Sequence, residues 1–194
     1  RDYDIVRQGA ASTGGKSKRH AQLLQCTDGF VYDDLGRPID LNSDKVDVIR
    51  EFVDGVGEPV LIYAAHTAAV SKLARAFADY GPSVIEGSTG DVTGQIDRFV
   101  TGKTTVMIAN ARYAAAMNLQ EKCRIVIFMS PSSKPDDRKQ GVGRVYRPGQ
   151  SRGVIVVDVV CDDTLDARRL ELVSGHEEMS EAQVEALLEM EAGR

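Results

Sequence analysis

The hydrophobic positions of this chain fall into two patterns that alternate along its middle. Short apolar runs, of the kind that is buried in a parallel sheet, recur between residues 59 and 160. They predict strands over 60–63, 83–85, 105–109, 125–129 and 154–157. Between these runs, apolar residues recur at the spacing of one helix face, most clearly at 70, 73, 74 and 77. Further helices are expected over 96–100 and 134–146.

Strands that alternate with helices imply parallel pairing, with helices on both faces of the sheet. We therefore predict an α/β fold of three layers, α/β/α, with a mainly parallel sheet. Sheets of this kind bind ligands in crevices at the carboxyl ends of their strands. The pattern thus directs attention to the loop that follows each strand.

The two flanks of this core are more helical. Residues 18–25 have a helical pattern, and Ser43 is a good N-cap for the helix that follows it. The tail is helical and acidic, with a capping box at Ser180 and Gln183. We expect three segments: a helical lead-in and start of the lobe at 1–57, a core at 58–162 and the tail at 163–194.

Composition supports one domain with a sizeable core, because 42% of the 194 residues are hydrophobic. The net charge of -5 argues, as a global figure, against a general nucleic-acid binder. The charge is uneven, however. Between Arg98 and Arg152 there are 11 basic residues against 3 acidic, and from Asp158 onward 3 against 11. This asymmetry indicates a basic edge that meets phosphate, although a solvated face and an acidic helix remain an alternative.

The cysteines and the chain start concern the environment of the protein. Cys26, Cys123 and Cys161 are odd in number and widely spread, which favours reduced thiols in the cytoplasm over a disulfide framework. No Cys/His spacing resembles a zinc site, and we expect no metal ligands in this chain. No apolar run approaches the ~20 residues of a membrane span, so no membrane partner is expected. Because the chain begins with Arg1 and not Met, we expect a piece of a longer protein.

The sharpest feature is the segment 140–150, which holds two arginines three residues apart. Arg144 and Arg147 would lie on one face of the helix predicted there, and such a fork of donors suits a polyphosphate. Gly141 and Gly143 each lower helix stability by ~1 kcal/mol relative to Ala, which indicates that something approaches closely. A surface helix with solvated arginines explains the residues equally well.

This segment resembles motif VI of the superfamily 2 helicases, most closely the Swi/Snf-type branch, whose pattern is roughly Q-x-x-G-R-x-x-R-x-G-Q. The matching residues are Gln140, Gly143, Arg144, Arg147, Gly149 and Gln150. The resemblance continues in order along residues 20–175. It includes 60–63 as motif IV, 86–89 with 96–99 as the G-S-T turn and its helix, 109–120 as motif V, and 154–160 with 164–166 as the closing stretch. Residues 29–33 resemble the start of the second lobe in bacterial and phage members, so we expect a bacterial or phage source.

The resemblance implies a RecA-like lobe that works with a partner lobe. In this family two such lobes clamp ATP, and the first holds the P-loop lysine and the acidic motif that binds Mg²⁺. The second supplies arginines that stabilise the transferred phosphate. By resemblance, Arg144 and Arg147 have this role, with Gln140 orienting nearby and Gly143 completing the nucleotide contact. ATP and Mg²⁺ are then held mainly by the missing first lobe, and the isolated chain is expected to be inactive.

The resemblance also implies a grip on nucleic acid, which we expect to be duplex DNA. Gly87, Ser88, Thr89 and Asn118 are the residues that would contact its backbone phosphates without reading sequence. Capping of a turn explains Ser88, Thr89 and Asn118 as well. One departure concerns motif V, where the family has glycines and this chain has Ala at 114–116. Alanine blocks the closest backbone approach, which weakens the expected coupling between ATP and nucleic acid.

Two other functions compete with this interpretation. Residues 10–17 nearly match a P-loop, with Ala for the first Gly, so the chain could be a complete small P-loop NTPase that uses Lys16. Alternatively, the alanines of motif V could mark a degenerate lobe that acts only as a nucleic-acid or protein binding module.

Overall fold

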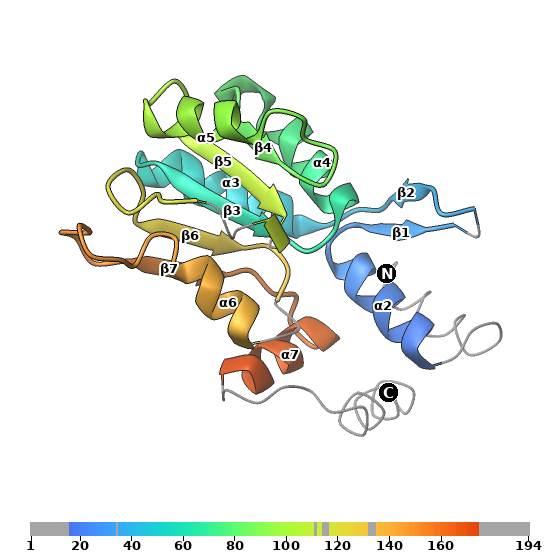
Figure 1. Cartoon of the computed structure of the whole chain (residues 1–194). Helices are drawn as coiled ribbons and strands as arrows, with labels where there is room; N and C mark the ends of the chain where they lie inside the picture. The colour runs from blue at the N-terminus through green and yellow to red at the C-terminus, as the bar shows by residue number, and fades with distance from the viewer. Residues whose placement is uncertain (1–15, 34, 111, 114–116, 132–134, 175–194) are drawn as a thin grey trace.

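The fold is a five-stranded parallel sheet with helices on both faces (Figure 1). The computed structural model describes residues 16–33, 35–110, 112–113, 117–131 and 135–174. The strand order is β4-β5-β3-β6-β7, and every neighbouring pair is parallel. The strands are β3 (Val60–Ala64), β4 (Ser83–Ile85), β5 (Val106–Asn110), β6 (Ile125–Phe128) and β7 (Ile155–Asp158). All five predicted strands are confirmed within one residue at each end.

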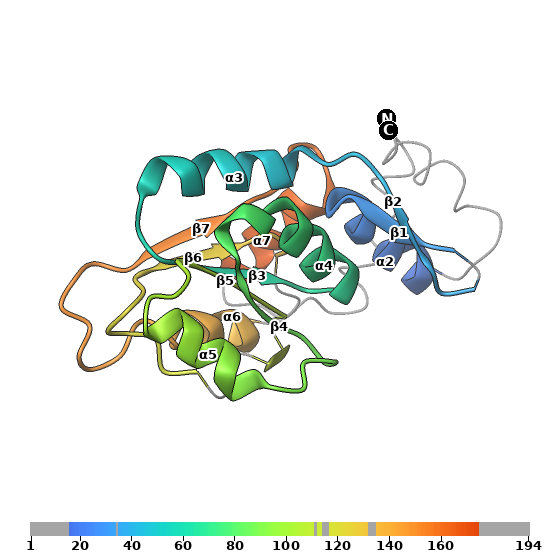
Figure 2. The ribbon, with the colours of Figure 1, turned by 90° about the horizontal axis from the view of Figure 1, so that it is seen from above.

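Alternate side chains of these strands build two separate cores. Val60 and Ile62 of β3 join the first core, while Leu61 and Tyr63 join the second, because successive side chains point to opposite faces. Both sets are buried, so the strands read as continuous apolar runs and not as alternating ones. Figure 2 shows the sheet edge-on between its helices. Helices α3 (Asp44–Val56) and α4 (Thr67–Ala76) cover the first face, and α5 (Val92–Val100) and α6 (Pro135–Val142) cover the second.

The ends of these helices follow the local sequence signals. Ser43 is the N-cap of α3, as predicted, and its hydroxyl accepts a hydrogen bond from the Lys45 N–H at 3.4 Å. After α4, a short 3-10 turn, η1 (Ala78–Tyr80), ends at Gly81, whose φ of 55° is left-handed. A side chain other than glycine would be strained in that conformation, so Gly81 terminates the segment.

The flanking segments lie beyond the carboxyl ends of the strands (Figure 1). Helix α2 (Lys16–Thr27) precedes a hairpin of β1 (Phe30–Tyr32) and β2 (Pro38–Asp40), and α7 (Leu165–Ser174) follows β7. The hairpin was not predicted, since strands of three residues give no periodic signal. The predicted capping box at Ser180 lies outside the described residues.

A buried cluster of charges ties both flanks to the core. The Lys45 ammonium at the start of α3 donates to Asp28 Oδ1 at 3.1 Å and is ion-paired with Asp166 of α7. All three side chains are at most 2% exposed. Burial raises the pKa of Asp28, but the Lys45 charge and hydrogen bonds outweigh it and bring that pKa below its usual value. The residue after α2 and the start of α7 are therefore tied to the start of α3 through one lysine.

The cysteines are free thiols, as the composition indicated. Cys26 and Cys123 are buried, and burial raises the pKa of Cys123 to about 11. They behave as small core residues. Within the described ranges, the structure contains no helix long and apolar enough to cross a membrane.

One predicted helix is wrong in extent. It was expected over 134–146, but α6 ends at Val142, and Arg144 and Arg147 lie in the turns after it. The backbone tightens there: the Arg144 N–H donates to Gly141 O at 3.2 Å, a bond of three residues instead of four. Gly141 and Gly143, two glycines within three positions, lower the local helix propensity and favour an end of the helix here. The arginines are thus not presented on one helix face.

Candidate functional site

The turn that carries the arginines is bonded to the end of the motif V segment. The Arg147 guanidinium donates through Nη1 to Asn118 Oδ1, and the Leu119 N–H donates to Arg144 O at 3.0 Å. The Gln150 amide donates to Gln120 O at 2.7 Å. Three hydrogen bonds therefore hold this turn, through Arg144, Arg147 and Gln150, against residues 118–120.

The side chain of Arg144 is only partly satisfied. Its Nε is buried and has no hydrogen-bond partner among the described residues. The hydroxyl of Tyr63, in the middle of the sheet, is also buried and finds no hydrogen-bond partner in the part of the chain that the structure describes. Burial raises the pKa of Tyr63, although the nearby Arg144 charge acts in the opposite direction. A buried guanidinium nitrogen is costly unless an acceptor reaches it.

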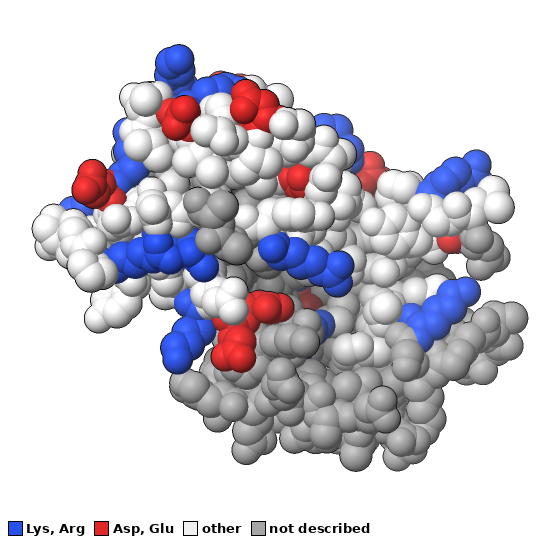
Figure 3. Space-filling view, in the orientation of Figure 1, with Lys and Arg blue, Asp and Glu red and all other residues white. Residues whose placement is uncertain are grey.

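Arg147 also lines a hollow of about 330 Å³ on the surface. The other lining residues are Tyr146, Pro148, Gln150 and Arg152. Tyr146 is 73% exposed, which is unusual for a large aromatic side chain. The hollow therefore combines two guanidinium groups with an uncovered ring. Figure 3 shows separate groups of basic side chains, with acidic ones next to them, over the region of β6 and α6.

The glycines of the segment have a structural explanation. A Cβ atom added at Gly141 would lie 3.1 Å from Tyr63 Cε2 and 3.3 Å from Phe128 Cζ. The two rings stack with centroids 5.4 Å apart and form a platform under α6. A Cβ at Gly143 would lie 3.1 Å from Lys139 O of the helix itself. The close approach that the sequence indicated is thus an approach of α6 to the sheet and of the chain to itself.

Gln140 is exposed on α6, and its side chain forms no hydrogen bond within the described part of the chain. It stays a predicted orienting residue that no contact supports.

The residues of the G-S-T turn lie elsewhere, after β4. Thr89 Oγ1 accepts from the Glu86 N–H at 2.9 Å and donates to Val84 O at 3.4 Å. Ser88 Oγ donates to Glu86 Oε1 at 2.8 Å and is exposed. The hydroxyl of Thr89 therefore closes the turn, while that of Ser88 can exchange its partner for another acceptor.

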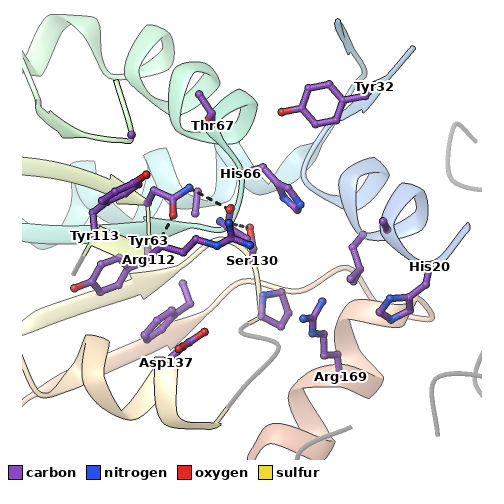
Figure 4. Close-up of a pocket in the computed structure, with 18 residues that line it drawn as sticks. His20, Tyr32, Tyr63, His66, Thr67, Arg112, Tyr113, Ser130, Asp137 and Arg169 are labelled. Atoms are coloured by element: carbon purple, nitrogen blue, oxygen red, sulfur yellow. Dashed lines mark hydrogen bonds between the residues drawn. The ribbon is translucent and has the colours of Figure 1, made fainter. Parts of the chain in front are cut away.

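Gly87 belongs to a second hollow, a pocket of about 570 Å³ at the carboxyl ends of the strands (Figure 4). We call it the carboxyl-end pocket. Its volume lies within the range of small-molecule sites. The polar and aromatic lining side chains are His20, Tyr32, Tyr63, His66, Thr67, Asn110, Arg112, Tyr113, Phe128, Ser130, Asp137 and Arg169. No residue lines both this pocket and the Arg147 hollow.

Sequence reasoning missed most of these residues. His66, Arg112 and Ser130 come directly after β3, β5 and β6, where a parallel sheet places its ligands. That rule pointed to the loops, but no motif singled out the side chains. His20 and Arg169 lie outside the sheet, and only the packing of α2 and α7 brings them to the pocket.

Comparison with known proteins places the fold in one family. The helicase conserved C-terminal domain family matches residues 44–149. The structure is similar to the C-terminal part of the Fun30 ATPase domain, with a TM-score of 0.68 and 22% identity over 78% of this chain and 53% of that one. It is also similar to the E. coli DEAD-box protein SrmB, solved bound to the regulator of ribonuclease activity A, with a TM-score of 0.52 and 17% identity over 60% and 69% of the two chains.

These structural similarities concern the fold, and the chain spans 53% of the Fun30 structure. No curated protein matches the chain by sequence. The RecA-like sheet found here is the one seen in helicase C-terminal lobes. Because the family match covers more than half of the residues, this chain belongs to the helicase conserved C-terminal domain family.

Proposed function

We propose that this chain is the second motor lobe of a Swi/Snf-type, ATP-dependent nucleic-acid translocase. The observation that carries the proposal is the bonding of the arginine turn to Asn118, because it links the residues expected at ATP to a residue expected at nucleic acid. The lobe works with a first RecA-like lobe in a longer protein. We divide its sequence into the lead-in at 1–57, the core at 58–162 and the tail at 163–194.

Arg144 and Arg147 are the groups proposed to meet the ATP phosphates. Guanidinium donors match phosphate oxygens bidentately, and the unpaired Arg144 Nε is a donor in need of an acceptor. Arg147 is the proposed arginine finger, and Gln140 and Gly143 are proposed to flank the phosphates. Bound ATP supplies the bond that is hydrolysed, and this donor set fits its phosphates but not a cation. We therefore assign Mg²⁺ to the first lobe.

The proposed grip on nucleic acid uses Gly87, Ser88, Thr89 and Asn118. Ser88 is the best supported of the hydroxyl residues, since it is exposed and, among the described residues, its hydroxyl bonds only to the half-buried Glu86. Duplex DNA is the proposed partner, on the strength of the Swi/Snf-type motif. The cytoplasm of a bacterial or phage-infected cell is the proposed location, which suits three free thiols.

The two alternatives differ from this proposal in what they predict. The P-loop candidate lies mostly outside the described residues, with Lys16 and Ser17 at the start of α2. A P-loop enzyme also needs an acidic residue at the end of a strand, and Asp158 at the end of β7, which could pass for it, is ion-paired with Arg138. Steady ATP turnover by the chain alone, lost in Lys16→Ala, would establish that function. A binding module would bind DNA but contribute nothing to turnover in the longer protein.

The test is ATP turnover by the full-length protein that contains both lobes. Arg147→Ala should lower kcat by roughly 10²–10³-fold, as for the loss of one preorganised donor, and leave ATP binding nearly intact. Arg152→Ala is the matched control, because this arginine lines the same hollow but is ion-paired with Glu58. Equal rates for the wild type and Arg147→Ala would refute the proposed finger.

A further inference from the structure

A tight turn follows Arg147 directly. The Gln150 N–H donates to Arg147 O at 3.0 Å, and Pro148 and Gly149 lie between them. Gly149 has a φ of 101°, so a proline followed by a left-handed glycine gives the pattern of a type II turn. The proline ring restricts the backbone further, because it fixes its own φ. The turn therefore holds Gln150 in a set position relative to Arg147.

The side chain of Gln150 uses its whole amide group in bonds to the backbone. Its Nε2 donates to Gln120 O at 2.7 Å and to Cys123 O at 2.9 Å. Its Oε1 accepts from the Arg152 N–H at 3.1 Å. An amide has two N–H donors, and each of them has an acceptor here. Gln150 is half-buried, and the two carbonyls belong to the segment that leads into β6.

The two carbonyls specify the chemistry of the side chain between them. Gln120 O and Cys123 O both accept from one nitrogen, so their negative ends converge on one position. A glutamine supplies two N–H groups to that position without adding charge. A glutamate of the same size supplies none when it is ionised, and it would face both oxygens with another oxygen. The contact thus needs the amide of Gln150 and not only a polar residue.

The chain beyond this turn is anchored as well. Arg152 Nη1 donates to Glu58 Oε2 at 2.8 Å, and Arg124 Nη2 donates to Glu58 Oε1 at 2.6 Å. Glu58 lies two residues before β3, so these ion pairs fix the chain at the amino end of the sheet. The backbone around Arg147 is therefore held on two sides, while its guanidinium contacts the side chain of Asn118.

We propose that Gln150 is a positioning residue for the arginine finger, because its amide holds the turn that carries Arg147 against the backbone at Gln120 and Cys123. This inference rests on the proposed function of Arg147 and adds a residue that does not itself touch ATP. A finger on a fixed backbone meets the phosphate in one geometry. A misplacement of ~1 Å in such a group can lower a rate ~10²-fold.

Hydrogen exchange in this chain tests the contact without ATP. Gln150→Met keeps the length of the side chain and removes its donors. The Leu119 N–H, which donates to Arg144 O at 3.0 Å, reports whether the two segments stay together. Its protection should fall about tenfold in the variant. The Met129 N–H, which donates to Tyr63 O at 2.9 Å, should keep its protection. Unchanged protection at Leu119, or an equal loss at Met129, would overturn the inference.

ATP turnover by the full-length protein tests the consequence. Gln150→Met should lower kcat by roughly 10–10²-fold and leave the KM for ATP unchanged, because Gln150 acts through Arg147. Gln25→Met is the matched control, since this side chain also bonds to backbone, at the Tyr32 N–H, but in the lead-in. It should turn over ATP normally.

A double variant separates this inference from the proposed finger. In an Arg147→Ala background, Gln150→Met should cause no further loss of kcat, and a further loss of the same size would overturn the positioning role. Normal turnover in Gln150→Met beside slow turnover in Arg147→Ala would refute the positioning role alone. Normal turnover in Arg147→Ala would refute the finger itself, and hydrogen exchange would still decide whether Gln150 holds the turn.

Discussion

Arg147 and Asn118 are 29 residues apart, and the Nη1 of the arginine donates a hydrogen bond to the Oδ1 of the asparagine. Arg147 is the residue we propose at the ATP phosphates, and Asn118 is one we propose at nucleic acid. An arginine that binds a phosphate must exchange or share this partner. The contact thus offers a direct path by which one ligand could influence the other.

If the path operates, Asn118→Ala should uncouple the two ligands in the full-length protein. The stimulation of ATP turnover by DNA should fall by about fivefold or more, the lower range of coupling energies between sites. Turnover without DNA should change much less. Asn118→Asp keeps the acceptor and adds a charge, so it should hold Arg147 more tightly and lower both rates. The path is absent if the ratio of stimulated to basal turnover is the same in Asn118→Ala and the wild type.

Gly141 should be intolerant of even one methyl group. Its Cβ would press on the stacked rings of Tyr63 and Phe128, and overpacking of this kind costs about 1–3 kcal/mol. The gain in helix propensity, about 0.5–1 kcal/mol, offsets part of this loss. We expect Gly141→Ala to lower the free energy of unfolding by about 1 kcal/mol.

The matched control is Gly55→Ala in α3, where an added Cβ meets nothing within 4 Å. This variant should be more stable than the wild type. Urea unfolding of the two variants measures the difference, and two stabilised proteins would mean that α6 is free to move away from the rings.

The hydroxyls of the G-S-T turn should separate into a structural and a binding residue. Thr89→Val removes the acceptor for the Glu86 N–H and should cost about 1 kcal/mol of stability, whereas Thr89→Ser should cost little. Ser88→Ala should leave the melting temperature unchanged but weaken DNA binding, measured by fluorescence anisotropy. Unchanged DNA affinity in Ser88→Ala would leave the turn with a structural role alone.

His20 should make stability fall in mild acid. Its pKa is about 4 in the folded chain, because of burial and the Arg169 charge, against an ordinary value of 6.5. Between these values the unfolded chain binds the proton and the folded chain does not, so folding is disfavoured there. Protonation of His20 therefore does not affect the free energy of unfolding above pH 6.5. Below that pH it lowers this free energy progressively, down to about pH 4. Urea unfolding at pH 7.5 and 5 should show a smaller pH difference for His20→Gln than for the wild type, while an NMR titration of His20 near 6.5 would contradict the assignment.

The fold and the site differ in how far they could be predicted. Five apolar runs predicted the five strands, because a strand buried on both faces leaves an unmistakable local signal. The family segment was evident from the spacing around Arg144 and Arg147. The helix predicted over 134–146 was too long, because the chain leaves α6 after Val142, near two glycines, and tightens into a three-residue hydrogen bond. The short hairpin of β1 and β2 had no periodicity to reveal it.

By itself, then, the sequence determined the parallel α/β sheet and the residues of the arginine segment. Both are encoded locally, in runs of neighbouring positions. Only the tertiary structure decided that Arg147 meets Asn118, that Gly141 serves the Tyr63–Phe128 platform, and that α2 and α7 complete a pocket at the sheet. These relationships join residues far apart in sequence, and they exist only when the buried Lys45 cluster and the two apolar cores bring the segments together. The net charge gave no indication of them, because it averages the basic stretch 98–152 with the acidic residues from Asp158 onward.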